Sequence, residues 1–577
     1  MRRLLQGQGA SRGNALGRAW VRLPDVLEVG EEHIEPGQVE AELERLHLAI
    51  ERVRAEMRSL RERLQGALPP ELGQFLDLHA LLLDDPELLQ GLDEAIRGQL
   101  LSADYALHLQ RERITAGFRA MDDAYFRSRV EDIDQVIGRI HASLHARHDG
   151  RTGMAGEVLA CESVAPAELA QLQQRGVVAV VTSAGSPLSH SAILARSLHL
   201  PMVVGVPGLL QRVADGEVLT VDGGTGEVVV EPGPADLRHH RERRRATARE
   251  LRALRRLRRE PTRTRDGSTI ELQANAESPA DIARAHALGA SGIGLYRTEF
   301  LFLQRTALPG EEEQFQAYRD AVLAMNGRVV TIRILDLGAD KADRTGLSLR
   351  DESNPALGLR GIRLAMARPD VLEVQLRAML RASAYGRLRV LVPMVSERGQ
   401  VLHVRAELAR LAAALRAEGH GVAANVPLGA MIEVPAAALM LPTFLGDVDF
   451  LSVGTNDLVQ YLLASDRDNE ALGELGSPLH PAVLRVLRDV IRTAAAAGKP
   501  VSVCGEMAGD PRLSPLLLAL GLEQFSMHPA TLLDVRQVVR ACDLMHLRAR
   551  LPALLRARDR SGIERWIARH HPPLGEG

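Results

Sequence analysis

The sequence has little cysteine, few aromatic residues and no long apolar run. Only three cysteines occur among 577 residues, Cys161, Cys504 and Cys542, so neither a disulfide framework nor a paired-cysteine metal or redox site is expected. No apolar segment approaches the ~20 residues of a membrane span, and the first residues lack the apolar core of a secretory signal. We therefore expect a cytoplasmic protein without membrane insertion.

The charge balance is also unremarkable. The formal net charge is -3, with 25% charged and 46% hydrophobic residues, which is typical of a globular chain and gives no general attraction to nucleic acid. Eleven arginines do crowd Arg238–Arg259, with leucines at helical spacing and Pro261 just beyond. We interpret this stretch as a solvated linker helix between two domains; a surface for an acidic partner is the alternative.

The first part of the chain changes character twice. From Val39 to Leu64 apolar residues alternate at spacings of four and three, which predicts a long amphipathic helix, and further helical segments continue to about residue 147. Short β-branched runs separated by Gly, Pro and Asp then follow to about residue 233. This pattern predicts a helical bundle followed by a small α/β domain.

The second part alternates strands with helices. Eight strands are predicted after Gly267, and eight βα units of this length favour a (β/α)₈ barrel, whose active site lies at the C-terminal ends of the strands. The predicted strands are 270–274, 292–295, 329–335, 388–392, 428–432, 450–453, 501–503 and 524–526.

One histidine stands in a motif suited to chemistry. In Gly185-Ser-Pro-Leu-Ser-His190, a serine followed by proline predicts a helix start, which places His190 in the opening turn near free backbone N–H groups. Such a position favours an anion, and a neutral imidazole is a good nucleophile near pH 7, although a lone histidine is more often structural. Three nearby side chains could hold a phosphate on His190: Ser189, Ser191 and Arg196.

Cationic residues follow two of the predicted barrel strands. Arg297 and Arg333 stand beside strand ends, and Lys341 follows in the same segment as Arg333. Guanidinium groups bind carboxylates and phosphates in two-point geometry, so a small, doubly anionic substrate is implied. Any one of these residues could instead form a surface salt bridge.

Acidic residues and a thiol follow other strands. Glu433 and Asp457 each come directly after a strand and could share one Mg²⁺ ion; a general acid–base pair is the alternative. Cys504 would be mostly protonated at neutral pH and could donate a proton to an enolate, or it could be a buried inert thiol.

The segments GLYRTEFLF, NPALGLRGIR, VGTNDLVQY and CGEMAGD resemble the phosphoenolpyruvate-protein phosphotransferases, the enzyme I family of the bacterial sugar phosphotransferase system, and the resemblance spans essentially the whole chain. It implies that His190 becomes a phosphohistidine, that Cys504 protonates enolpyruvate to pyruvate, and that Mg²⁺ is the cofactor, with Glu433 and Asp457 as ligands. Phosphoenolpyruvate would be bound by Arg297, Arg333, Arg360, Lys341, Asn456, Asp457 and Arg467.

The resemblance also implies an α/β organisation in four parts. Residues 1–29 and 148–233 would form the α/β phosphohistidine domain, 30–147 an inserted helical subdomain that binds a small histidine-containing phosphocarrier protein, 234–262 a helical linker, and 263–577 the barrel. The barrel would pair into a homodimer. Because His190 and the barrel residues belong to different domains, the linker is expected to act as a hinge.

The sequence departs from the family in two places, and two alternative functions stay open. The usual Gly-Gly-Arg-Thr-Ser-His is here Gly185-Ser-Pro-Leu-Ser-His190, and Gly-Gly-Asp-Lys is here Gly338-Ala-Asp-Lys341. The first change removes an arginine and a hydroxyl near the phosphate, but the nucleophile is retained. The alternatives are a pyruvate-phosphate dikinase-like enzyme, which needs a nucleotide-binding domain, and a regulatory paralogue without turnover.

Overall fold

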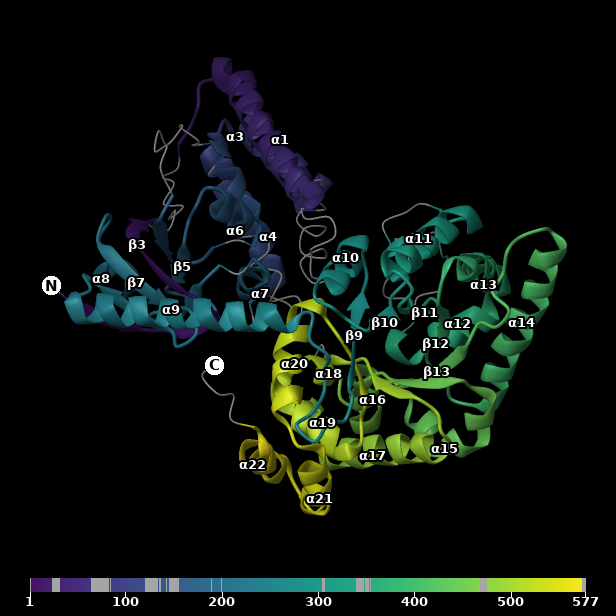
Figure 1. The fold of residues 1–577 in the computed structure, drawn as a ribbon. Coiled ribbons are helices and arrows are strands. Elements are labelled where there is room, and N and C mark those ends of the chain that lie inside the picture. Colours follow the sequence, from purple (N-terminus) through teal and green to yellow (C-terminus); the bar gives the residue numbers. More distant parts are fainter. Residues whose placement is uncertain are drawn as a thin grey trace. The chain divides into compact units, whose positions relative to one another are not determined.

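The computed structural model divides into two units, Met1–Ala248 and Arg249–Gly577, each with its own core (Figure 1). Lys341 and Arg467 lie outside the residues that the structure describes, as do most of the helix predicted at 75–83 and part of the helix predicted at 130–145. The described residues are 2–22, 32–63, 82–83, 85–119, 133, 136–141, 143–144, 155–164, 166–187, 189–198, 200–303, 307–338, 347, 352, 354–466 and 475–572.

Unit 1 is built on one mixed sheet with the strand order β1-β8-β7-β3-β4-β5-β6-β2. Strands β3, β4, β5 and β6 run parallel, and the pairs β1/β8, β7/β8, β3/β7 and β2/β6 are antiparallel. Strands from both ends of the unit's sequence thus share one sheet. Their bounds are β1 Arg3–Gln6, β2 Gln8–Ser11, β3 Asn14–Val21, β4 Glu157–Cys161, β5 Ala179–Thr182, β6 Met202–Val204, β7 Val218–Asp222 and β8 Glu227–Val230.

One apolar cluster joins the helices of unit 1 to one face of this sheet. Helix α1 (Val39–Arg63) buries Leu43, Leu46 and Ile50, the positions that its four-three periodicity predicts, in the same apolar cluster as Leu159 of β4. The other face has a separate apolar cluster. The remaining described helices are α3 Pro86–Gln99, α4 Ala103–Arg119, α6 Pro166–Gln174, α7 His190–Ser197, α8 Leu209–Arg212 and α9 Pro234–Leu257. Helix α9 is the predicted arginine-rich helix.

Unit 2 is a closed barrel of eight parallel strands in sequence order, with β16 pairing back to β9. This confirms the predicted barrel. The bounds differ by at most two residues: β9 ends at Ala276 rather than at residue 274, and β11 ends at Arg333 rather than at residue 335. The strands are β9 Glu271–Ala276, β10 Gly292–Tyr296, β11 Val329–Arg333, β12 Leu388–Val392, β13 Leu428–Ile432, β14 Phe450–Val453, β15 Val501–Val503 and β16 Gln524–Met527.

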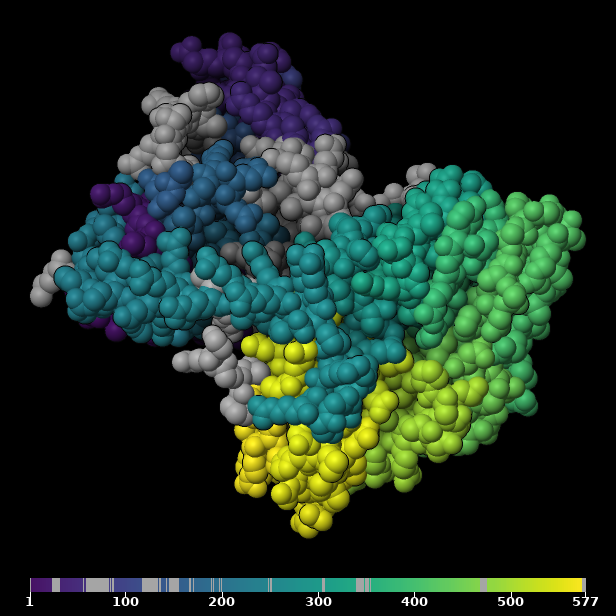
Figure 2. Space-filling view, viewed as in Figure 1, coloured from purple at the N-terminus to yellow at the C-terminus, as the bar shows by residue number. Residues whose placement is uncertain are grey.

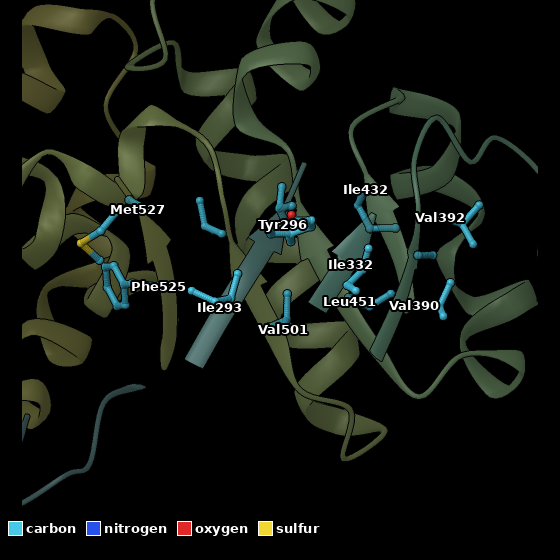
Figure 3. Packing of buried hydrophobic residues seen from close by; sticks show 14 of the residues in the cluster. Ile293, Tyr296, Ile332, Val390, Val392, Ile432, Leu451, Val501, Phe525 and Met527 are labelled. Carbon is cyan, nitrogen blue, oxygen red and sulfur yellow. The ribbon is translucent and has the colours of Figure 1, made fainter. Parts of the chain in front are cut away.

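Side chains alternate between the two surfaces of the barrel wall, as strand geometry requires. Val390 and Val392 belong to the large apolar cluster between strands and outer helices, part of which is drawn in Figure 3. Leu391, between them, belongs instead to a small separate cluster with Leu295, Met431, Phe450 and Cys504. Buried side chains therefore pack on both surfaces of the barrel wall. This packing holds the strand ends in place.

The outer helices enclose the strands, and the long α14 forms one green edge of unit 2 in Figures 1 and 2. No helix in the described ranges is both long enough and apolar enough to cross a membrane. The helices are α10 Pro279–Ala287, α11 Glu311–Ala324, α12 Gly361–Ala367, α13 Pro369–Ala382, α14 Arg398–Ala417, α15 Pro435–Phe444, α16 Thr455–Leu463, α17 Pro481–Ala496, α18 Glu506–Gly509, α19 Ser514–Leu520, α20 Leu532–Ala541, α21 Leu544–Leu555 and α22 Arg560–His570.

Candidate active site

The C-terminal ends of the barrel strands carry the residues that the sequence predicts there. Arg297 follows β10, Arg333 ends β11, Glu433 follows β13, and Cys504 follows β15. Asn456 and Asp457 lie in the first turn of α16, directly after β14. Parallel strands end at the same rim of a barrel, so these side chains share one mouth.

Two arginines are joined by one buried carboxylate at this mouth. Asp336 accepts from Nε and Nη2 of Arg360 at 3.0 and 2.9 Å, and Nη1 of Arg333 lies 3.0 Å from its Oδ2. Glu299 adds a second anion, since its Oε1 accepts from Nη2 of Arg333 at 3.1 Å and from the Asp336 N–H at 2.9 Å. Arg360 also reaches Oδ2 of Asp457 at 3.3 Å. The arginines are thus fixed by alternating charges.

These contacts set the ionisation of the group. Burial alone would raise the pKa of Asp336, but the charges of Arg333 and Arg360 outweigh it and lower the pKa below its ordinary value. Burial opposes the charge of both guanidinium groups as well, yet their acidic neighbours raise the pKa of Arg333 and of Arg360. All three groups are therefore charged at neutral pH.

Sequence reasoning did not single out Asp336 or Glu299. Both stand in the motifs that drew attention to the arginines, Asp336 three residues after Arg333 and Glu299 two residues after Arg297. The available signal was an acidic residue beside each basic one at a strand end. Such a residue is equally expected in an exposed salt bridge, so the sequence pattern alone did not indicate that Asp336 and Glu299 belong to the site.

Glu433 is a buried carboxyl group of the mouth whose pKa is raised. It is 1% exposed, and its Oε1 accepts from the Met394 N–H at 2.7 Å. Burial, together with the negative charges of Asp336 and Asp457, raises the pKa of Glu433 to about 8. A Cβ atom at Gly454 would lie 2.6 Å from Oε2 of Glu433, so glycine leaves the second oxygen its space.

This donor set fits a magnesium ion. Glu433 and Asp457 offer hard carboxylate oxygens close enough to repel each other, and a cation between them would relieve that repulsion. In the described part of the chain no group of three or more His, Cys, Asp or Glu side chains is arranged to hold a metal. Magnesium commonly uses only one or two protein carboxylates and completes its shell with water and substrate oxygens.

Cys504 and Asn456 are held by neighbouring strand ends. The Cys504 N–H donates to the Val453 carbonyl at 3.1 Å, and its own carbonyl accepts from Nδ2 of Asn275 at 2.9 Å. Burial raises the pKa of the Cys504 thiol, so the thiol carries its proton at neutral pH. Asn456 accepts from the Glu506 N–H at 3.0 Å and donates to Oε1 of Glu506 at 3.3 Å, which fixes the turn after Cys504.

Arg297 is the most open of the described cationic residues of this mouth. Its backbone N–H donates to Ala276 at 3.0 Å, while its guanidinium pairs with Glu277 and its side chain is 37% exposed. It can therefore reorient more easily than the buried arginines. The other two predicted cationic contacts, Lys341 and Arg467, belong to the segments left undescribed.

His190 lies in the opening turn of a helix, as predicted, but the helix begins at a different residue from the one predicted. Helix α7 begins at His190 itself, with Ser189 as its cap: Ser189 has extended backbone angles and its Oγ accepts from the Ala192 N–H at 3.3 Å. The predicted start at Ser186 and Pro187 is wrong by one turn, because Ser189 offers an equally good cap nearer the helix. The described part of His190 is its backbone.

Two side chains predicted to hold a phosphate on His190 have backbone partners instead. Oγ of Ser191 donates to the Val164 carbonyl at 2.6 Å. Nη1 of Arg196 donates to the carbonyls of Ala10 and Pro187 at 2.9 and 2.8 Å. In this arrangement both side chains fasten α7 to the rest of unit 1.

Three family models match the chain. They describe PEP-utilising enzymes: the N-terminal domain matches residues 6–129, the mobile domain 153–226 and the PEP-binding domain 252–544. The last of these alone covers the strands and helices that carry the barrel mouth.

Similar proteins share almost the full length. A phosphoenolpyruvate-protein phosphotransferase of Cupriavidus necator is 43% identical, with 96% of this chain and 97% of the relative covered. Proteins of the same name from Geobacillus stearothermophilus and Staphylococcus aureus are 40% and 38% identical over 92% and 93% of this chain, and 92% and 94% of their own.

Two solved structures with similarity to part of the chain have low TM-scores. An NMR solution structure of Enzyme I is 28% identical with a TM-score of 0.35, covering 42% of this chain and 99% of its own. The N-terminal domain of Enzyme 1 - Nitrogen is 27% identical with a TM-score of 0.34, covering 41% of this chain and 98% of its own.

Proposed function

Because this chain belongs to the phosphoenolpyruvate-protein phosphotransferases, a family of PEP-utilising enzymes, we propose that it moves the phosphoryl group of phosphoenolpyruvate to His190 and then to a histidine of a small phosphocarrier protein. Phosphoenolpyruvate-dependent phosphoryl transfer is its activity. The dikinase-like alternative is not favoured, since the relatives that match the whole chain carry the phosphotransferase name.

One observation carries the assignment of the site: two buried arginines, held by one carboxylate, lie at a barrel mouth beside a pair of buried acidic residues. Phosphoenolpyruvate has a carboxylate and a phosphate on three carbons. Arg333 and Arg360 suit such anions because guanidinium groups bind both in two-point geometry. Arg297, Lys341, Asn456 and Arg467 complete the proposed set.

The proposed cofactor is Mg²⁺, held by Glu433 and Asp457. When bound, it supplies positive charge that offsets the charge of the phosphoryl oxygens. The buried arginines Arg333 and Arg360 also supply positive charge that offsets the charge of the phosphoryl oxygens. Since their orientation is already set by Asp336 and Glu299, little reorganisation is needed as charge shifts onto the leaving enolate oxygen.

The proposed transfer breaks the P–O bond of phosphoenolpyruvate and forms a P–N bond to the His190 imidazole. The enolate left behind needs a proton on its terminal carbon to become pyruvate. Cys504 can supply that proton, because burial keeps its thiol protonated, and the resulting thiolate regains a proton from solvent. The opening turn of α7, at the positive end of the helix dipole, suits the phosphate then carried by His190.

The remaining parts of the proposal concern partners. We assign the phosphocarrier to the helical segment 30–147, hinge motion to the arginine-rich helix α9, and self-association as a homodimer to the barrel unit. Action in the cytoplasm also stays a prediction. These assignments rest on family membership and on the arrangement of domains along the chain.

A single labelling experiment tests the central step. The purified full chain is incubated with phosphoenolpyruvate and Mg²⁺, and intact-mass analysis follows an acid-labile phosphoryl adduct. We expect the adduct in the native sequence and its loss in His190→Ala. A folded native chain that acquires no adduct, or an adduct unchanged in His190→Ala, would refute the proposal; the first result would favour a regulatory paralogue.

A further inference from the structure

Gln375 is a polar residue on the inward face of an outer helix of the barrel. It lies on α13 and is 1% exposed, among the buried apolar side chains Leu372, Leu376 and Met379 of the same helix. Burying an amide is unfavourable unless its hydrogen bonds are replaced, and a leucine or methionine would fill the same space without that cost. The contacts of the Gln375 amide should therefore explain why a polar residue is buried at this position.

The Gln375 amide joins two loops at the barrel mouth. Its Oε1 accepts from the Leu335 N–H at 2.9 Å, and its Nε2 donates to Oγ1 of Thr298 at 3.2 Å. Leu335 lies in the loop after β11, between Arg333 and Asp336, and Thr298 follows β10. One side chain thus fastens the segments that leave two neighbouring strands.

Thr298 continues the connection toward the site. It is 0% exposed and stands between Arg297 and Glu299 in the sequence, and its Oγ1 donates to the carbonyl of Arg333 at 3.1 Å. The two loops are therefore joined twice, once by Gln375 directly and once through Thr298. The first join uses the Leu335 N–H, two residues after Arg333, and the second uses the carbonyl of Arg333 itself, an arginine that the proposed function places on the substrate.

The second proton of the Gln375 amide is also used. Nε2 donates to the Tyr318 hydroxyl at 3.2 Å, which donates to Oε1 of Gln314 at 3.0 Å, and Nε2 of Gln314 donates to the Pro309 carbonyl at 3.0 Å. Each of these groups is buried and each donor has an acceptor. A satisfied network of this kind fixes one rotamer of each member, including Gln375.

We propose that Gln375 is a positioning residue that holds the loops after β10 and β11 together, so that Arg297, Arg333 and their acidic neighbours meet phosphoenolpyruvate in one arrangement. The inference rests on the proposed function, because it concerns the same site. It goes further by placing part of the catalytic geometry in an outer helix that does not touch substrate. Small misplacements of reacting groups are costly, so a loss of this support should reduce the rate of the chemical step more than substrate affinity.

The test uses the full chain with Mg²⁺ and phosphoenolpyruvate. Rapid-quench measurements give the maximal rate constant of His190 phosphorylation and the half-saturating phosphoenolpyruvate concentration. We expect Gln375→Met to lower the maximal rate by about 10- to 100-fold while the half-saturating concentration changes by less than about 3-fold. Leu376→Ala, which deletes a buried apolar side chain one residue along α13, should lower thermal stability without a comparable fall in rate.

A second pair of variants covers a Gln375→Met chain that does not fold. Thr298→Val removes the hydroxyl but keeps the shape and should reproduce the rate loss, whereas Thr298→Ser keeps the hydroxyl and should restore most of the rate. Equal rates in Thr298→Val and Thr298→Ser, or a rate loss in Leu376→Ala as large as that in Gln375→Met, would overturn the proposal. Absence of phosphorylation in the native chain would overturn the proposed function, and this inference with it.

Discussion

Asp336 and Arg360 form a buried two-point ion pair, with Nε–Oδ1 and Nη2–Oδ2 distances of 3.0 and 2.9 Å. The Asp336 side chain is 0% exposed and is shared with Arg333. Removing one partner of a buried pair leaves the other charge without compensation, which is far more damaging than loss of an exposed pair. Asp336 therefore holds the orientation of Arg333 and Arg360, the two buried arginines proposed to bind substrate.

We therefore predict that Asp336→Asn lowers the free energy of unfolding of the barrel unit by about 3 kcal/mol. The rate of His190 phosphorylation should fall by at least about 10-fold, because Arg333 and Arg360 lose their common support. Urea denaturation and rapid-quench phosphorylation measure the two effects. The matched control is Asp447→Asn, which breaks the exposed two-point pair with Arg398 and should cost under about 1 kcal/mol. Similar losses in the two variants would contradict the prediction.

Glu433 predicts a pH dependence of magnesium binding. Its folded-state pKa is raised to about 8, and metal coordination needs the carboxylate form. Below pH 8 a proton competes with the ion, so affinity should fall by up to 10-fold per pH unit and binding should release about one proton. Calorimetry at pH 7 and 9, in buffers of different ionisation enthalpy, measures both. Affinity that does not change between these pH values would speak against Glu433 as the ligand.

The same shift has a consequence for the metal-free chain. Between the ordinary glutamate pKa and about 8, the folded state holds a proton that the unfolded state has released. Stability is therefore lost as the pH rises through this window. Glu433→Gln keeps the size of the side chain and should flatten this dependence. A metal-free native chain whose stability is level from pH 5 to 8 would contradict the shift.

Cys504 should matter for pyruvate formation and not for folding. Because burial raises its thiol pKa, the proton is present at neutral pH, and Cys504→Ala should slow pyruvate release by about 100-fold or more. A lactate dehydrogenase-coupled assay measures pyruvate directly. Cys542→Ala is the control: it removes another buried thiol of the barrel unit, at the end of α20 and away from the strand ends, and should leave turnover near the native value. Equal rates in the two variants would remove Cys504 from the chemistry.

The sequence predicted the barrel because strands and helices alternate with the right periods, and each predicted strand matches an observed one. The rule that active-site groups follow barrel strands also placed Arg297, Arg333, Glu433 and Cys504 at one rim. Their positions are as predicted, while their roles stay proposals. The helix carrying His190 was located correctly but its first residue was not, since two serines compete as caps and local sequence does not rank them.

Residues that act across the fold could not be predicted in the same way. Gln375 lies 77 positions from Thr298 and 40 from Leu335, on a helix whose pattern reads as ordinary amphipathic. Of the two partners of Asp336, Arg333 lies only three residues away, whereas Arg360 lies 24 residues away and is brought to it by the fold of the segment between β11 and α12. A structural role for a polar side chain can be recognised only when its burial and its hydrogen-bond partners are both known, and the sequence gives neither.

Arg536 supports a final prediction about how the linker helix is anchored. This arginine of α20 is 2% exposed; it donates to the carbonyls of Leu257, Leu288 and Gly289 at 2.8, 3.2 and 2.7 Å, and to Oγ1 of Thr262 at 3.1 Å. Burial lowers the pKa of Arg536 to about 10, yet the group stays charged at neutral pH. It thus binds the last turn of α9 to the barrel unit.

Arg536→Met should leave those acceptors without a donor and lower the unfolding free energy of the barrel unit by about 2–4 kcal/mol, measured by urea denaturation. Arg548→Met, which removes an exposed partner of Glu523, should cost under about 1 kcal/mol. Amide exchange should also quicken at the C-terminal end of α9 in Arg536→Met, because its last carbonyls lose their anchor. If the exchange there stays as slow as in Arg548→Met, the end of α9 is held by apolar packing of Leu254 and Leu257 rather than by the arginine.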